Sequence, residues 1–144
     1  MAIVKPDATV SKNMERFLEI YDKYVVRGGT ADLKQWLMDS DFFAAPASTR
    51  YHGSYEGGLC AHSVNVWNQM VRLLKAYPEV KTNGETVAII ALLHDVCKIN
   101  LYKVDFRNAK NEAGVWEKVP YYAHDEKFAY GNHGGKSVLA NTFA

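Results

Sequence analysis

The pair His94-Asp95 interrupts the most apolar stretch of the chain. All other residues from 87 to 97 are apolar, and a helix that is apolar all round is a central, buried helix. An isolated carboxylate in such a place costs at least several kcal/mol, so Asp95 requires a partner. A salt bridge, a helix-cap hydrogen bond and a metal ion would each meet this requirement, and the stretch by itself leaves all three open.

Length and composition indicate a single globular domain over residues 1–144. The chain is 48% hydrophobic and 23% charged, which excludes disorder and low complexity. The longest apolar run, 87–93, is too short to span a bilayer and no signal peptide precedes it, so we expect a cytoplasmic protein with no membrane partner. Lys and Arg (17) nearly balance Asp and Glu (16), giving a net charge of +1. A broad basic face for duplex nucleic acid is therefore not expected.

Hydrophobic periodicity predicts a mainly α fold with one small β-hairpin. Helices are expected over 11–27, from a cap at Thr30, over 59–77, and from a cap at Thr82 or Asn83 to about residue 99. Alternating residues at 102–107 predict a half-buried strand, and a second extended stretch follows at 115–122 after a seven-residue turn. Residues 134–144 are typical of a helix that is just beginning, so we expect the C-terminal part of the domain to be missing.

The predicted 59–77 helix carries a histidine on its inward stripe. His62 shares that stripe with the apolar residues Leu59, Val66, Met70, Leu73 and Tyr77. By itself, such a histidine is more often a satisfied core residue than a ligand. With His94 and Asp95, however, it forms a set of two imidazoles and a carboxylate that suits a divalent cation between packed helices. On a continuous helix His94 and Asp95 point about 100° apart, which makes this geometry demanding.

Two motifs carry these three residues, GGLCAHS at 57–63 and LLHDVCKI at 92–99. Together they resemble the HD superfamily of metal-dependent phosphohydrolases, and the resemblance covers residues 45–140. It implies an HD-domain-like helical bundle, on which residues 1–44 are expected to pack as N-terminal helices. It also implies one or two divalent ions (Mn, Fe, Co, Ni, Zn or Mg) bound by His62, His94 and Asp95, with His133, in a later glycine-rich turn (GNHGG at 131–135), as a further ligand.

The chain departs from this family at its end. The closing aspartate of the family should come well after His133, but the chain stops eleven residues later. Asp105 and Asp125 do not match that position. We therefore expect the last metal carboxylate to lie beyond Ala144.

Hydrolysis of a phosphate ester suits these residue types. A bound divalent ion neutralises phosphate charge and lowers the pKa of a bound water towards about 7. Asp95 is expected to hold the ion and orient the water, and the resemblance implies that Lys98 faces the substrate phosphate. Arg50 and His52, in the loop before the 59–77 helix, and Lys136, at the start of the last helix, are further candidates for substrate binding.

The resemblance implies a metal-dependent phosphohydrolase acting on a small phosphate-containing substrate, a nucleotide or a short oligonucleotide. Two other classes remain open at this point. Some proteins with this ligand set are diiron oxygenases, and a non-catalytic domain could keep the helices and use the site to sense a nucleotide. The sequence also leaves open whether the protein is a homo-oligomer.

Overall fold

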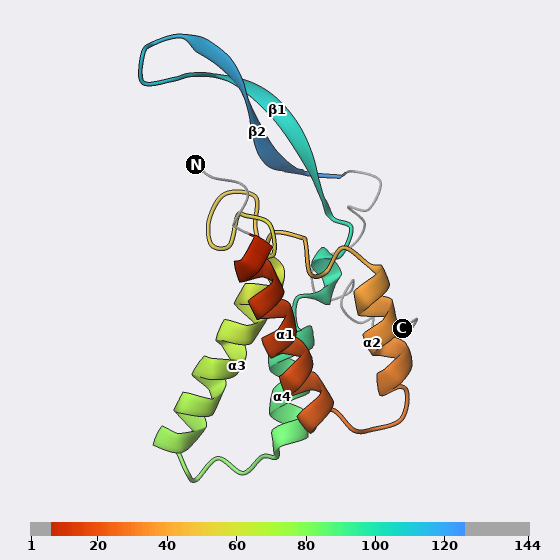
Figure 1. Ribbon diagram of the computed structural model, residues 1–144. Helices are drawn as coiled ribbons and strands as arrows, with labels where there is room; N and C mark the ends of the chain where they lie inside the picture. The colour runs from red at the N-terminus through yellow and green to blue at the C-terminus, as the bar shows by residue number, and fades with distance from the viewer. Residues whose placement is uncertain (1–6, 126–144) are drawn as a thin grey trace.

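The computed structural model describes residues 7–125 of the chain. It confirms a mainly α architecture with one small antiparallel hairpin (Figure 1). The elements, in chain order, are α1 (Asp7–Tyr24), α2 (Thr30–Asp39), α3 (Gly58–Ala76), α4 (Gly84–Leu93), the short 3₁₀ helix η1 (Val96–Lys98), β1 (Tyr102–Lys110) and β2 (Trp116–His124). No helix in this part of the chain is both long and apolar enough to cross a membrane.

The core lies where α1, α3 and α4 pack against one another (Figure 1). Phe17 of α1 and Leu92 of α4 are completely buried there. The loop between α2 and α3 adds Phe42 and Phe43, whose ring centroids lie 5.0 and 5.3 Å from that of Phe17. This aromatic packing fixes the start of the loop 40–57, which leads directly into α3.

Helix α1 ends at Tyr24, before the predicted end at Arg27, and begins at Asp7 rather than at residue 11. The amide groups of Val26 and Arg27 donate hydrogen bonds to Oε1 of Glu85, at 3.1 and 3.0 Å, instead of continuing the helix. Nε of Arg27 donates to the same oxygen at 3.2 Å. A long-range partner in the first turn of α4 therefore decides where α1 ends.

The caps of the next helices agree only in part with prediction. The side chain of Asn83 caps α4 by accepting a hydrogen bond from the amide of Thr86 at 2.9 Å, as predicted. The predicted cap at Thr30 is wrong, because Thr30 is already the first residue of α2. The cap position is held by Gly29, at a φ of 85°, a left-handed conformation that glycine adopts without steric cost.

The stripe predicted for α3 is only partly buried. Leu59 is buried, but Leu73 and Tyr77 are 57% and 55% exposed. The face that packs on the core instead runs through Val64 and Trp67, shifted by one residue from the predicted stripe. The predicted burial of the C-terminal half of the stripe is therefore wrong, because the neighbouring helices cover a slightly rotated face.

The hairpin projects from the helices as an arm (Figure 1). Its antiparallel register pairs Tyr102 with His124 at the base and Lys110 with Trp116 at the tip, so the connection at 111–115 is shorter than the seven-residue turn predicted. The prediction of a half-buried strand is wrong, since Val104 is 53% and Phe106 60% exposed. The alternating pattern is present, but the arm extends away from the helical core that could have covered one face.

The apolar stretch 87–97 is not one helix. Helix α4 ends at Leu93, before the predicted end near residue 99, and η1 begins at Val96. His94 keeps helical backbone angles (φ −63°, ψ −25°), but Asp95 has φ −111° and ψ 16°, the sparsely populated region in which many active-site residues lie. The polar pair therefore lies at the junction of two helices.

Candidate metal centre

Three side chains from separate elements converge at the C-terminal end of α4. His62 extends from the second turn of α3, His94 follows α4, and Asp95 immediately precedes η1. Nε2 of His62 lies 3.2 Å from Nε2 of His94, and each nitrogen lies 3.4 Å from Oδ2 of Asp95. Within residues 7–125, these are the three histidine, cysteine or acidic residues whose ligand atoms lie close enough together to hold one metal ion.

The spacing of the three ligand atoms fits a single ion. Atoms about 2.1 Å from a metal lie roughly 3.0 Å apart in octahedral coordination and roughly 3.4 Å apart in tetrahedral coordination. The separations of 3.2 and 3.4 Å in this cluster fall within that range. Imidazole nitrogen and carboxylate oxygen are also suitable donors for divalent transition metals. The His62/His94/Asp95 group could therefore hold a divalent ion.

The end of α4 explains how two consecutive residues reach one point. On a continuous helix the side chains of His94 and Asp95 would point about 100° apart. Because the backbone of Asp95 departs from helical angles, its carboxylate comes within 3.4 Å of Nε2 of His94. Because α4 ends at Leu93, the 100° divergence expected from the sequence does not keep the two side chains apart.

A backbone hydrogen bond sets which nitrogen of His94 faces the cluster. Nδ1 of His94 lies 2.9 Å from the carbonyl oxygen of Ala91. A carbonyl can only accept, so Nδ1 carries a proton, and loss of the proton from Nε2 would leave the lone pair of Nε2 directed at the cluster. Metal-binding histidines are commonly held by such a bond from the other ring nitrogen.

Charge interactions keep Asp95 ionised. Burial would raise the pKa of Asp95, but hydrogen bonds with His94 and Lys98 hold that pKa well below its usual range. The hydrogen bond to Asp95 raises the pKa of His94, whereas burial lowers the pKa of His62. An ionised carboxylate and a neutral imidazole are the forms in which these side chains bind metals. The pKa shifts of Asp95 and His62 therefore favour a bound ion, whereas His94 has to give up its Nε2 proton when an ion binds.

Lys98 is directed towards Asp95 and the loop before α3. Its Nζ donates hydrogen bonds to Oδ2 of Asp95 at 3.0 Å and to the carbonyl oxygen of Ala47 at 2.7 Å. The hydroxyl of Tyr102 donates to the same carbonyl at 3.4 Å. Burial raises the pKa of Tyr102 to about 12, so the hydroxyl keeps its proton. No sequence motif marks Ala47 or Tyr102, because their contact joins positions 55 residues apart.

The loop 40–57 brings one of its two candidate substrate-binding residues to the cluster. The ring centroid of His52 lies 4.8 Å from that of His62. Arg50 is exposed and lines a different cavity, together with Arg107 and Tyr121 of the hairpin. A basic residue alternating with apolar ones on a strand is an ordinary surface pattern, so the sequence did not single out Arg107.

Two further candidate residues, His133 and Lys136, lie outside the described residues. Neither Asp105 nor Asp125 belongs to the metal-ligand group found within residues 7–125.

Comparison with known proteins gives one partial likeness. No family model matches the chain, and no solved structure matches it. A segment of 57 residues, 38% of the chain, is 39% identical to a dihydroneopterin 2',3'-cyclic phosphate phosphodiesterase of Methanocaldococcus jannaschii. The match spans 23% of the length of that protein.

Proposed function

We propose that this chain is a metal-dependent phosphohydrolase of the HD type that cleaves a phosphate ester of a nucleotide or a short oligonucleotide. The observation that carries the proposal is the convergence of Nε2 of His62, Nε2 of His94 and Oδ2 of Asp95 within 3.4 Å of one another. The partial relative is named a phosphodiesterase, which supports the hydrolysis of a phosphate ester as the class of reaction.

The residues around the cluster suit this chemistry. A divalent ion held by His62, His94 and Asp95 would neutralise phosphate charge and acidify a bound water. Asp95 stays ionised, so its carboxylate can accept a hydrogen bond from a water and thereby orient it. The ammonium group of Lys98, 3.0 Å from Asp95, is placed to donate to a phosphoryl oxygen bound beside it. His52, exposed beside His62, would contact the substrate on the open side.

The proposal is tested by metal analysis followed by a phosphate-release screen. The purified chain is loaded separately with Mn, Fe, Co, Ni, Zn and Mg and assayed with nucleotides, 2',3'-cyclic nucleotides and short oligonucleotides. We expect Asp95→Asn to lower metal affinity and hydrolysis by at least about 100-fold, because even partners that only hydrogen-bond a metal ligand change affinity by about 10- to 100-fold. Asp32→Asn, which removes an exposed carboxylate of α2, should change neither.

Three results would contradict the proposal. Asp95→Asn could retain both bound metal and hydrolysis. The iron-loaded protein could consume oxygen without releasing phosphate, which would indicate an oxygenase. Tight nucleotide binding without turnover under every metal would indicate a sensing domain.

A further inference from the structure

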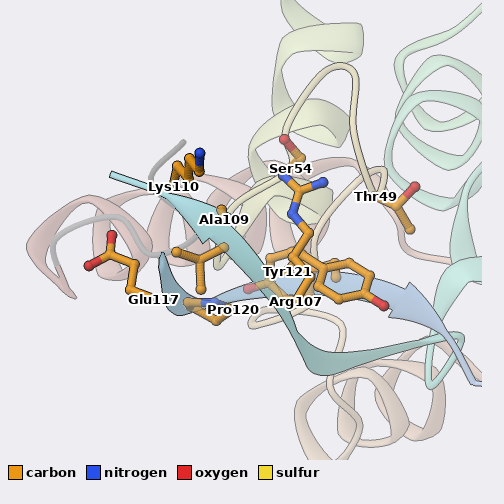
Figure 2. Close-up of a pocket in the computed structure, with 10 residues that line it drawn as sticks. Thr49, Ser54, Arg107, Ala109, Lys110, Glu117, Pro120 and Tyr121 are labelled. Carbon is orange, nitrogen blue, oxygen red and sulfur yellow. The ribbon is translucent and has the colours of Figure 1, made fainter. Parts of the chain in front are cut away.

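Two adjoining cavities lie between the hairpin and the loop 48–55. Their volumes are about 310 and 320 Å³, and they share four lining residues. Figure 2 shows the larger one, with the side chains of Arg107 and Tyr121 projecting from the hairpin on the side where Ser54 and Thr49 lie. We call the smaller cavity and its opening the loop–hairpin groove; it is lined by Thr49, Arg50, Tyr51, Arg107, Tyr121 and Tyr122.

The charge of the groove favours an anion. Arg50 and Arg107 both line it, and no acidic residue of the described chain does. Within residues 7–125, neither guanidinium group forms an ion pair. Two like charges at one cavity repel each other unless an anion lies between them, and guanidinium groups bind phosphate through paired hydrogen bonds.

The aromatic rings of the groove favour a nucleobase next to that anion. Tyr51 is 80% exposed, and Cζ of Arg107 lies 5.7 Å from the ring centroid of Tyr121. Proteins that bind single strands stack bases on such rings and contact the backbone with neighbouring basic side chains. Inorganic phosphate would use the guanidinium groups but not the rings, so the groove is better matched to a nucleotide.

One loop connects the groove to the candidate metal centre. Oγ of Ser48 accepts hydrogen bonds from the amides of Arg50 and Tyr51 at 3.1 and 2.8 Å, which fixes the turn that presents both side chains. The next residue, His52, contacts His62 of the metal cluster. The groove and the cluster are therefore held in a defined relation by consecutive residues.

We propose that the loop–hairpin groove binds the nucleotide next to the scissile phosphate, so that the substrate is a short single-stranded oligonucleotide rather than a mononucleotide. Arg50 and Arg107 hold the backbone phosphate, and Tyr121 stacks on the base. The position of the scissile bond rests on the function proposed above. Binding in the groove itself requires neither metal nor hydrolysis, so the two proposals are tested separately.

The test is fluorescence anisotropy with a labelled single-stranded hexathymidylate, measured without metal in the full chain and repeated over a series of salt concentrations. Arg107→Gln and Arg50→Gln should each weaken binding about tenfold and lower the slope of log K against log salt by about 0.7, the value for one phosphate contact to a single strand. Tyr121→Leu should weaken binding about tenfold without changing the slope. Arg72→Gln, at an exposed arginine of α3 that lines neither cavity, is the matched control and should bind as the wild type does.

Competition with smaller ligands tests the substrate class. Thymidine monophosphate and an abasic hexamer should each displace the hexamer at least about tenfold less well than unlabelled hexathymidylate, because each lacks either the second phosphate or the bases. Equal competition by the monophosphate, or wild-type binding by Arg107→Gln, would overturn the inference. If the groove variants lose binding but the wild type hydrolyses nothing under any metal, the groove proposal stands and the hydrolase proposal is refuted. If the wild type hydrolyses the substrate but the groove variants bind as it does, the hydrolase proposal stands and the groove proposal is refuted.

Discussion

Asp95 is almost completely buried and lies within 3.4 Å of three nitrogen groups. Oδ2 of its carboxylate is 3.0 Å from Nζ of Lys98 and 3.4 Å from the Nε2 atoms of His62 and His94. A carboxylate in this position is stabilised as an anion despite its burial, because each neighbour carries a positive charge or can donate a proton. Without these neighbours, the same side chain would be an uncompensated buried charge.

The acid stability of the metal-free protein should depend on Asp95. Its folded-state pKa lies below its usual value, so below about pH 4 the unfolded chain binds a proton that the folded chain does not. The free energy of unfolding is therefore expected to decrease as the pH falls from about 5 to about 3. Asp95→Asn should flatten this decrease in urea titrations, whereas Asp32→Asn should leave it unchanged. Equal slopes in Asp95→Asn and the wild type would contradict this expectation.

At the scale of elements, backbone hydrogen bonds join the start of α3 to the loop before it. The amide of Gly57 donates to the carbonyl of Ala44 and that of Leu59 to the carbonyl of Ala45, both at 2.9 Å. The loop thus satisfies amide groups that a helix N-terminus leaves without intrahelical partners. The carbonyl oxygen of Gly53, from the same loop, packs directly against Gly58. This close approach holds the segment that carries His52.

A side chain at Gly58 should therefore disrupt the site as well as the fold. The Cβ of Gly58→Ala would overlap the backbone carbonyl of Gly53, which cannot move aside as a flexible side chain can. We expect a loss of about 2–3 kcal/mol in the free energy of unfolding, together with weaker metal binding. Gly28→Ala is the matched control, because no atom lies within 4 Å of the added Cβ, and it should change stability by less than about 1 kcal/mol. Urea denaturation of both variants measures the free energy of unfolding. Similar decreases in the two would contradict the proposal that the close contact between Gly53 and Gly58 stabilises the fold.

At the scale of the whole molecule, a helical core carries a projecting hairpin (Figure 1). The buried residues of the core come from α1 to α4, η1, the loop 40–57 and Val25, which directly follows α1. The hairpin, in contrast, leaves Phe106 and Trp116 60% and 66% exposed. A two-stranded sheet with little buried surface adds little to global stability. What the hairpin supplies is one side of the loop–hairpin groove, through Arg107, Tyr121 and Tyr122.

Removal of the hairpin should abolish hexathymidylate binding and leave the thermal stability of the helical core nearly unchanged. We expect a variant in which a short Gly-Ser turn replaces residues 103–123 to keep its helical circular-dichroism signal and to melt within about 5 °C of the wild type. The same variant should lose hexathymidylate binding, since Arg107 and Tyr121 are removed. Cooperative loss of the helices would show instead that the hairpin is part of the folding core.

Much of the fold follows from local pattern. Apolar spacing and capping residues place four helices and the hairpin in the right order, because they depend on neighbours a few residues apart. The polar pair in an apolar stretch singles out His94 and Asp95 as residues in need of partners. The burial of each stripe is less predictable, as Leu73 and Phe106 show, because periodicity reveals an apolar face but not whether another element covers it.

By itself, the sequence singled out His62, His94 and Asp95 as side chains that could bind a metal, since residue type and spacing along the chain are read directly from it. Only the tertiary structure decided that α4 ends at Leu93, which lets Asp95 turn back towards His62 and His94. It also decided that Lys98 reaches Ala47 and that Arg50 and Arg107 line the same groove. Both arrangements bring together positions more than 30 residues apart, and their geometry depends on how the whole chain packs, which no local pattern encodes.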